Sequence, residues 1–557
     1  MTIERSERTI KGKPISTGLA EGRAYVYREP LQSLDLPTPI IASDVEREID
    51  FLEKATGVIS EDLASLATKV EKEMDARLAS VFEAHKMMVN DPSLKIELQT
   101  EIRDNLVSAS SAVRSVFLRW EKRFLLMESQ ISRHKGDDMK DLSNRLSNAL
   151  SGIKVNRLGS LPSGGILVAK RLLPSDTVFL SKQSAAAVLL EYGGASSHAA
   201  LFAREMGLPC IAQVHGILQR IQHNAPLLVD AELGTVVLHP SKKSIAAFQK
   251  KISRRNATVS RISRKSHEPA FTIDGTSIQV LANISSRADA DRAVDNGADG
   301  VGLYRTELAY LGRSDPPSED ELLEEMQHTL APFEGKPVTI RLLDIGADKP
   351  LSYTGFLAES NPALGRRGIR LLLEFPQLLD TQLRAILRFS TERDARILIP
   401  MATLTQDITA TRERLTVASK QLAIAQIPPL GIMIETPAAA LSLKEFASFC
   451  DFASFGSNDL TQYAFAADRE NAAVEPYFQD SHGAILRLME IARADAPDLP
   501  LSICGELAGR SRHTEEILRC GLRSLSVAPP MIPEIKDRIR KLHYARSKTN
   551  NNPTRDL

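Results

Sequence analysis

The stretch Leu430–Asp459, LGIMIETPAAALSLKEFASFCDFASFGSND, contains two short apolar runs separated by a helical stretch. The runs Leu430–Ile434 and Phe452–Gly456 have the length and apolar character of strands buried in a parallel sheet. Each run is followed by polar groups, Glu435 after the first and Asn458-Asp459 after the second. The stretch therefore predicts one repeat of an alternating strand–helix fold with functional groups at its strand ends.

Similar apolar runs recur on both sides of this stretch, and helical stretches separate most of them. The other predicted strands are Ile278–Ile284, Gly300–Leu303, Val338–Leu343, Ile397–Met401, Leu501–Cys504 and Leu525–Val527. Eight strands with interposed helices over about 270 residues fit a (β/α)8 (TIM) barrel. We place this barrel at residues 269–544.

The segments before the barrel differ in texture. Residues 43–153 are rich in Ala, Leu, Glu, Lys and Arg with helical spacing, which predicts a helical bundle. Residues 1–42 and 154–240 both contain strand-like runs, so we expect one α/β domain into which the bundle is inserted. Residues 241–268 predict a linker helix. The polar tail, residues 545–557, is predicted to be disordered.

The overall composition is that of a soluble globular protein with several domains. The 557 residues are 43% hydrophobic and 25% charged, and Lys+Arg and Asp+Glu both number 70. This balance argues against nucleic acid or an anionic membrane as the main partner. The sequence has no apolar run long enough for a membrane span and no apolar signal core, so a cytoplasmic protein is expected. The four dispersed cysteines argue against disulfides and structural zinc.

The polar residues that follow the barrel strands should gather at one rim, because catalytic groups of such barrels lie at the C-terminal strand ends. Arginines suit carboxylate and phosphate oxygens, and Glu435 with Asp459 would supply the carboxylates that Mg²⁺ takes. Each residue alone is more often a surface group, and a cysteine on an apolar strand is usually packed. Their convergence favours a site for a doubly anionic ligand with a hard metal. The rim residues are Arg305, Arg341, Asp344, Glu435, Asn458, Asp459, Arg469 and Cys504.

A second candidate site is the histidine in the segment Gly193–Ala200, GGASSHAA, which follows the apolar run Ala187–Leu190. The glycines allow a tight turn, and a serine can cap the helix that follows. His198 would then lie in the first helical turn, where the helix dipole favours a neutral imidazole and a bound anion. A neutral imidazole is the nucleophile that a phosphoryl acceptor requires. The alternative is a capped helix whose histidine merely packs.

These motifs resemble a known family. GGASSHAALFAREMGLPCIA (193–212) is similar to the phosphohistidine signature of phosphoenolpyruvate-utilising enzymes. The barrel motifs GVGLYRTEL, RLLDIGADKPL, NPALGRRGIR, GIMIETPAA, FGSNDLTQYAFAADR and SICGELAGR resemble, in order and spacing, those of enzyme I of the bacterial phosphotransferase system. The resemblance covers nearly the whole chain, from about Lys11 to Leu542.

The resemblance implies a phosphoenolpyruvate-protein phosphotransferase with a swivelling phosphohistidine domain, an inserted helical domain that docks the carrier HPr, a linker helix and a dimerising barrel. It implies that His198 accepts the phosphoryl group and that Cys504 protonates the enolate. It also implies that Arg305, Arg341, Asn458 and Arg469 bind phosphoenolpyruvate, and that Glu435 and Asp459 bind Mg²⁺. The matching carrier-docking segment, Gly136–Asp141, agrees only loosely, with Lys140 where arginine is usual.

Two other readings remain open. A phosphoenolpyruvate synthase or pyruvate phosphate dikinase would need a large nucleotide-binding domain, and the helical insert shows no glycine-rich phosphate loop. A regulatory paralogue of the nitrogen type would usually carry an extra sensory domain at its N-terminus. Because this chain starts directly with the α/β domain, the transport form is favoured. Its sugars and its carrier are not indicated by the sequence.

Overall fold

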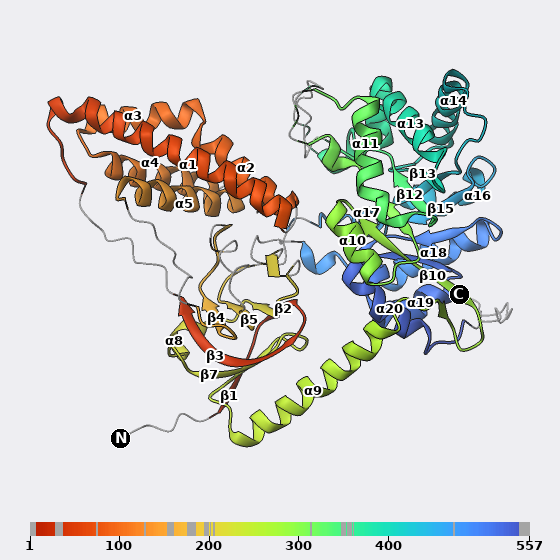
Figure 1. The fold of residues 1–557 in the computed structure, drawn as a ribbon, viewed down its shortest axis with the longest axis horizontal. Coiled ribbons are helices and arrows are strands. Elements are labelled where there is room, and N and C mark those ends of the chain that lie inside the picture. The colour runs from red at the N-terminus through yellow and green to blue at the C-terminus, as the bar shows by residue number, and fades with distance from the viewer. Residues whose placement is uncertain are drawn as a thin grey trace, which may run out of the picture. The chain divides into compact units, whose positions relative to one another are not determined.

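The computed structural model describes residues 7–27, 37–73, 76–126, 130–152, 161–174, 176, 185–193, 200, 202–203, 206–311, 313, 315–346, 353, 359, 361–469, 471 and 474–544. The chain divides into two compact units, Met1–Ala257 and Thr258–Leu557 (Figure 1). No helix in the described part of the chain is long and apolar enough to cross a membrane.

The first unit combines a mixed sheet with a helical bundle, as the sequence predicted. The sheet has the strand order β1-β8-β7-β3-β4-β5-β6-β2. Its strands β7 and β8 form an antiparallel hairpin that pairs Leu227 with Leu238. The strands are β1 (Arg8–Lys11), β2 (Lys13–Ser16), β3 (Leu19–Tyr27), β4 (Ile166–Ala169), β5 (Ala187–Leu190), β6 (Cys210–Ala212), β7 (Pro226–Asp230) and β8 (Thr235–Leu238), with the short helix α8 (Ile217–Arg220) between β6 and β7.

The helical bundle lies between β3 and β4 in sequence, which confirms that the helices are inserted into the α/β fold. Its described helices are α1 (Val45–Glu73), α2 (Ala76–Val89), α3 (Pro92–Asn105), α4 (Ala109–Leu126) and α5 (Gln130–Leu150). The start of α3 shows how the sequence sets a boundary. Asp91 accepts hydrogen bonds from the backbone N–H groups of Ser93 and Leu94, and Pro92 occupies the first turn, where its missing N–H costs nothing. The predicted linker helix is α9 (Lys242–Arg264).

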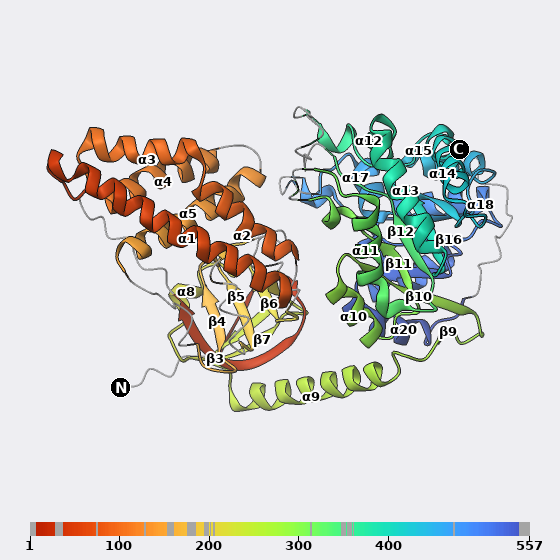
Figure 2. The ribbon, with the colours of Figure 1, turned by 45° about the horizontal axis from the view of Figure 1, so that its top comes forward.

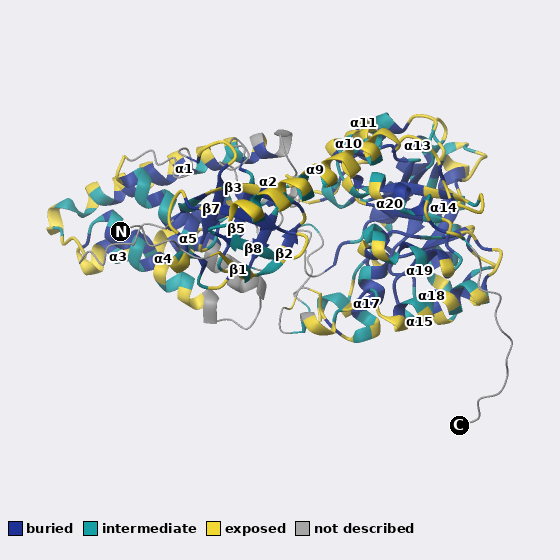
Figure 3. Cartoon of the chain, turned by 90° about the horizontal axis from the view of Figure 1, so that it is seen from below, coloured by how far each residue is buried: buried dark blue, intermediate teal, exposed yellow. Residues whose placement is uncertain are grey.

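The second unit contains a closed barrel of eight parallel strands, because β10 pairs with both β11 and β17. All eight predicted strands are present, and one short strand, β9 (Ala270–Phe271), pairs antiparallel with β10. The barrel strands are β10 (Ser277–Ile284), β11 (Val301–Tyr304), β12 (Val338–Arg341), β13 (Ala395–Ile399), β14 (Leu430–Ile434), β15 (Phe452–Phe455), β16 (Leu501–Ile503) and β17 (Ser524–Val527). These strands are mostly buried, and the exposed residues lie mainly on the surrounding helices (Figure 3).

A ring of helices surrounds these strands (Figure 2). The helices are α10 (Arg287–Asp295), α11 (Glu319–Leu330), α12 (Ile369–Glu374), α13 (Pro376–Ser390), α14 (Thr405–Leu422), α15 (Pro437–Leu441), α16 (Leu443–Phe446), α17 (Ser457–Phe465), α18 (Gly483–Asp495), α19 (Thr514–Arg519) and α20 (Ile532–Ile539).

Two barrel strands end two residues before their predicted ends: β12 ends at Arg341 instead of Leu343, and β13 ends at Ile399 instead of Met401. Pro400 has no N–H to donate to the sheet, and Met401 has a φ of 56°, a left-handed conformation that a strand cannot continue. Strand β13 therefore ends two residues before its apolar run does, which brings the backbone of Met401 to the end of the barrel.

Candidate active site

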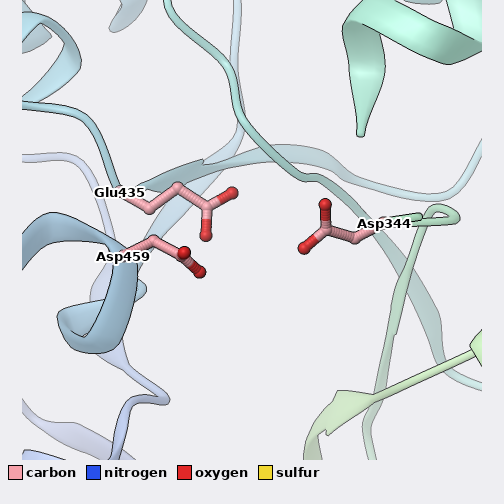
Figure 4. A group of neighbouring side chains, drawn as sticks. All are labelled: Asp344, Glu435 and Asp459. Carbon is pink, nitrogen blue, oxygen red and sulfur yellow. The ribbon is translucent and has the colours of Figure 1, made fainter. Parts of the chain in front are cut away.

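Three carboxylates meet at the C-terminal end of the barrel strands. Glu435 directly follows β14, Asp459 lies in the first turn of α17 after β15, and Asp344 follows β12. One oxygen of each lies within 4.8 Å of an oxygen of the others. Glu435 and Asp459 lie side by side, and Asp344 points toward them from the opposite side (Figure 4). A cluster of this kind can bind a hard divalent cation.

Two arginines form hydrogen bonds with the carboxylate of Asp344. Arg341 donates from Nη1 to Asp344 Oδ2 at 3.0 Å and from Nη2 to Glu307 Oε1 at 2.8 Å. Arg367 donates from Nη2 to Asp344 Oδ2 at 2.9 Å and from Nη1 to Asp459 Oδ1 at 3.0 Å. Although burial opposes its ionisation, the guanidinium groups of Arg341 and Arg367 lower the pKa of Asp344 to about 2. Asp344 is therefore ionised and fully engaged with arginine.

Glu435 has a different environment. Its side chain is 1% exposed, and its Oε1 accepts a hydrogen bond from the backbone N–H of Met401. Burial raises the pKa of Glu435 to about 8, with further contributions from the negative charges of Asp459 and Asp344. A cation bound between Glu435 and Asp459 would relieve this repulsion, so the residues present fit a magnesium ion.

Glycine at position 456 makes room for Glu435. A Cβ added at Gly456 would lie 2.9 Å from Glu435 Oε2 and 3.1 Å from Glu435 Cβ. Contacts that short do not occur without movement, so the absence of a side chain at 456 allows the carboxylate its present position. The glycine is part of the sequence FGSND, in which the same short segment also supplies Asn458 and Asp459.

The loop after β16 brings a thiol and an amide to the same end of the barrel. Cys504 is 3% exposed, and burial raises the pKa of its thiol to about 11. The thiol therefore carries its proton at neutral pH and is able to act as a proton donor. Asn458 Oδ1 accepts a hydrogen bond of 3.0 Å from the backbone N–H of Glu506, which ties the loops after β15 and β16 together.

The remaining predicted arginines also lie at this end. Arg305 directly follows β11, and its positive charge acts on the thiol of Cys504. Arg469 is 40% exposed, and its Nη1 lies 3.9 Å from Asp459 Oδ2. The structure thus brings seven predicted site residues to one end of the barrel: Arg305, Arg341, Glu435, Asn458, Asp459, Arg469 and Cys504. The eighth, His198, lies outside the described residues, as does the tail 545–557.

Two contacts of this site were not predicted from the sequence. Asp344 was recognised only as a rim residue, and Arg367 only as part of the motif GRRGIR, yet together they link β12 to α17. A signal was present for each, because Asp344 follows a barrel strand closely and Arg367 lies in a motif of the resemblance. Their pairing required the fold, since the two residues are 23 positions apart in the sequence.

Two residues of the segment Gly136–Asp141, which loosely matches a carrier-docking segment, make contacts inside the helical bundle. Asp138 and Asp141 are buried in the bundle against His85, whose Nε2 lies 3.0 Å from Asp138 Oδ1. His85 Nδ1 lies 3.7 Å from Asp141 Oδ2. These two aspartates therefore link α5 to α2 within the bundle.

Comparisons with known proteins identify the family. Models of PEP-utilising enzymes match three regions: the N-terminal domain at residues 11–135, the mobile domain at 161–234 and the PEP-binding domain at 259–544. A phosphoenolpyruvate-protein phosphotransferase of Haloferax volcanii is 35% identical over 95% of this chain and 94% of its own length. One of Geobacillus stearothermophilus is 33% identical over 96% of this chain and 93% of its own.

Among solved structures, a solution structure of an enzyme I protein is 28% identical and covers 44% of this chain and 99% of its own. Its TM-score of 0.38 is too low to add to the sequence match. The alignments with the Haloferax volcanii and Geobacillus stearothermophilus proteins cover almost all of this chain and almost all of each relative, at more than 30% identity. The chain therefore belongs to the phosphoenolpyruvate-protein phosphotransferase family of PEP-utilising enzymes.

Proposed function

We propose that this chain transfers the phosphoryl group of phosphoenolpyruvate (PEP) to His198 and then to a histidine of a small carrier protein. One observation carries the proposal: in a chain of this family, arginines, two buried carboxylates and a protonated thiol converge at one end of the barrel. PEP is a carboxylate and a phosphate on a three-carbon enol, so it needs cationic contacts at both anionic ends and a proton donor at carbon.

The arginines suit the anionic ends of PEP. Arg305, Arg341 and Arg469 would contact its carboxylate and phosphate oxygens, and Asn458 would donate to the phosphate. The Nε–H of Arg341 is buried and has no hydrogen-bond partner among the described residues. A buried donor without a partner is costly, and a bound anion would supply the missing acceptor. Glu435 and Asp459 would hold Mg²⁺, which neutralises charge on phosphoryl oxygens when bound.

The proposed first step forms a bond between a ring nitrogen of His198 and phosphorus and breaks the bond between phosphorus and the enol oxygen. The arginines stabilise the negative charge on the transferring oxygens. The enolate that leaves takes a proton at its terminal carbon from the thiol of Cys504 and becomes pyruvate, and the thiolate regains a proton from solvent. In the second step the phosphoryl group passes from His198 to the carrier histidine.

Radiolabelled PEP tests the acceptor. The wild-type protein with Mg²⁺ should be labelled, and His198→Ala should not be labelled. His215→Ala is a matched control, because His215 is an exposed histidine of the same unit, after β6. It should be labelled like the wild type. Equal labelling of wild type and His198→Ala would refute the assignment of His198.

The partner is proposed to be an HPr-type carrier that docks on the helical bundle. Large apolar side chains are exposed there, among them Met87 at 70% on α2 and Val58 at 55% on α1, and exposed apolar groups on helices favour a protein contact. The labelled protein should pass its label to the cognate carrier, and Met87→Glu should slow this step without changing labelling by PEP. Transfer to carriers of the sugar-transport or the nitrogen type would distinguish the two branches of the family.

A homodimer formed through the barrel is proposed as well. Leu404, Val417, Leu441 and Phe449 are exposed on or beside α14, α15 and α16. Helix α14 adjoins the segment after α16, because Arg412 Nη2 in α14 donates to the carbonyl oxygen of Phe449 at 2.7 Å. Sedimentation should show a dimer for the wild type and a weaker one for Phe449→Glu, and an unchanged dimer would exclude this face. A cytoplasmic location stays a prediction.

A further inference from the structure

A buried glutamine on one of the helices around the barrel strands contacts two of the loops that carry the active site. Gln382 belongs to α13 and is 2% exposed. Its Nε2 donates to Thr306 Oγ1 at 3.0 Å, and its Oε1 accepts from the backbone N–H of Leu343 at 3.0 Å. Thr306 lies between Arg305 and Glu307 after β11, and Leu343 lies between Arg341 and Asp344 after β12.

Thr306 continues this chain of hydrogen bonds. Its Oγ1 donates to the carbonyl oxygen of Arg341 at 3.1 Å. The direction of every bond is fixed by the two ends, because the N–H of Leu343 can only donate and the carbonyl of Arg341 can only accept. A single arrangement therefore satisfies all the groups. Thr306 is 5% exposed, so its bonds are shielded from water.

A charged contact joins the same two loops on the side of the active site. Glu307 Oε1 accepts from Arg341 Nη2 at 2.8 Å and from the backbone N–H of Asp344 at 3.1 Å. Substrate oxygens would compete for the guanidinium of Arg341, because that guanidinium is the group proposed to bind PEP. The bonds of Gln382 and Thr306 involve no group proposed to touch substrate, so substrate binding leaves them intact.

We propose that Gln382 and Thr306 are positioning residues that set the spacing between Arg305 and Arg341 for binding PEP. The inference rests on the proposed function and adds residues that act through the backbone of the two loops. Bidentate arginine contacts need a defined geometry, and a misplacement of about 1 Å costs roughly a hundredfold in rate. The uncharged side chains of Gln382 and Thr306, which we call the clamp, keep this geometry through their hydrogen bonds without adding a charge to an anion-binding site.

Three substitutions test the clamp. Thr306→Val keeps the shape of the side chain and removes its hydroxyl, whereas Thr306→Ser keeps the hydroxyl. Gln382→Met removes both hydrogen bonds of the Gln382 side-chain amide and keeps a similar volume. Thr411→Val is the matched control, because Thr411 is fully buried and its Oγ1 donates to the backbone carbonyl of Asp407 at 2.7 Å within α14. All variants are compared with the wild type in PEP-dependent labelling, KM for PEP, kcat and melting temperature.

Thr306→Val and Gln382→Met should each raise KM for PEP at least tenfold, and Thr306→Ser should stay within threefold of the wild type. The double variant should be no worse than the stronger single variant, because both act through one chain of bonds. Thr411→Val should lower the melting temperature and leave KM unchanged. A KM within twofold of the wild type in Thr306→Val, with lowered melting, would overturn the clamp. A wild type that PEP does not label would instead overturn the proposed function.

Discussion

Replacing Gly456 with alanine tests the proposed metal site more sharply than removing a ligand would. The substitution adds one methyl group and changes no charge. The backbone at Gly456 has a φ of −88°, which alanine adopts without strain. The added Cβ would lie 2.9 Å from Glu435 Oε2, 3.1 Å from Glu435 Cβ and 3.2 Å from Met433 Cγ. The main effect of the substitution must therefore be a steric overlap that displaces the side chain of Glu435.

The size of the effect follows from these distances. Ordinary contact between such atoms begins at about 3.4 Å, so the Glu435 carboxylate must retreat by about 0.5 Å. Metal–oxygen distances tolerate only about 0.2 Å of change. If a displacement of about 1 Å costs roughly a hundredfold, half of that should cost about tenfold. We expect the Mg²⁺ concentration for half-maximal pyruvate release to rise about tenfold in Gly456→Ala.

The assay is a Mg²⁺ titration of PEP-dependent pyruvate release, with circular dichroism to monitor folding. Gly483→Ala is the matched control, because a Cβ at Gly483 has no atom within 4 Å and the residue lies in the same barrel unit. That variant should titrate like the wild type. If Gly456→Ala is folded and its Mg²⁺ dependence is unchanged, Glu435 is not a metal ligand in the position described.

Three further predictions concern the same end of the barrel. Arg367→Gln removes a positive charge that contacts Asp459, so Mg²⁺ should bind at least threefold more tightly without PEP, as measured by calorimetry, while KM for PEP rises. Cys504→Ala should still be labelled in a single turnover but release pyruvate about a hundredfold more slowly, in line with the usual contribution of a general acid. Because burial raises the pKa of Cys504 to about 11, the Cys504-dependent part of pyruvate release should stay constant through neutral pH and fall as the pH rises through that value.

The barrel and most of its site were predictable because the information is local. Each strand is a short buried run, and Glu435 and Cys504 stand at or directly after the end of such a run. Parallel strands in a closed barrel end at one rim, so the order of residues along the chain was enough to bring these groups together. The end of β13 was misplaced because apolar character alone does not reveal the left-handed backbone at Met401.

The contacts between distant residues were not predictable in this way. Gln382 did leave a signal, since it lies on the apolar face of α13 between Leu379 and Leu383. A polar side chain on a buried face must have partners, but the sequence does not say which. Asp138 and Asp141 gave the opposite impression, because a polar segment resembles an exposed one until the buried partner His85 is known.

The pattern of charge within the site indicates which carboxylates a metal ion would use. Asp344 is bound by the guanidinium groups of both Arg341 and Arg367, so its charge is already compensated. Within the described residues, Glu435 receives a backbone hydrogen bond and no arginine contact, whereas Asp459 shares Arg367 with Asp344 and has Arg469 Nη1 at 3.9 Å. Of the three carboxylates, Glu435 is therefore the one whose charge the arginines compensate least. A divalent cation between Glu435 and Asp459 would supply that positive charge, whereas one bound to Asp344 would have to displace Arg367 and also Arg341, which is proposed to bind the substrate.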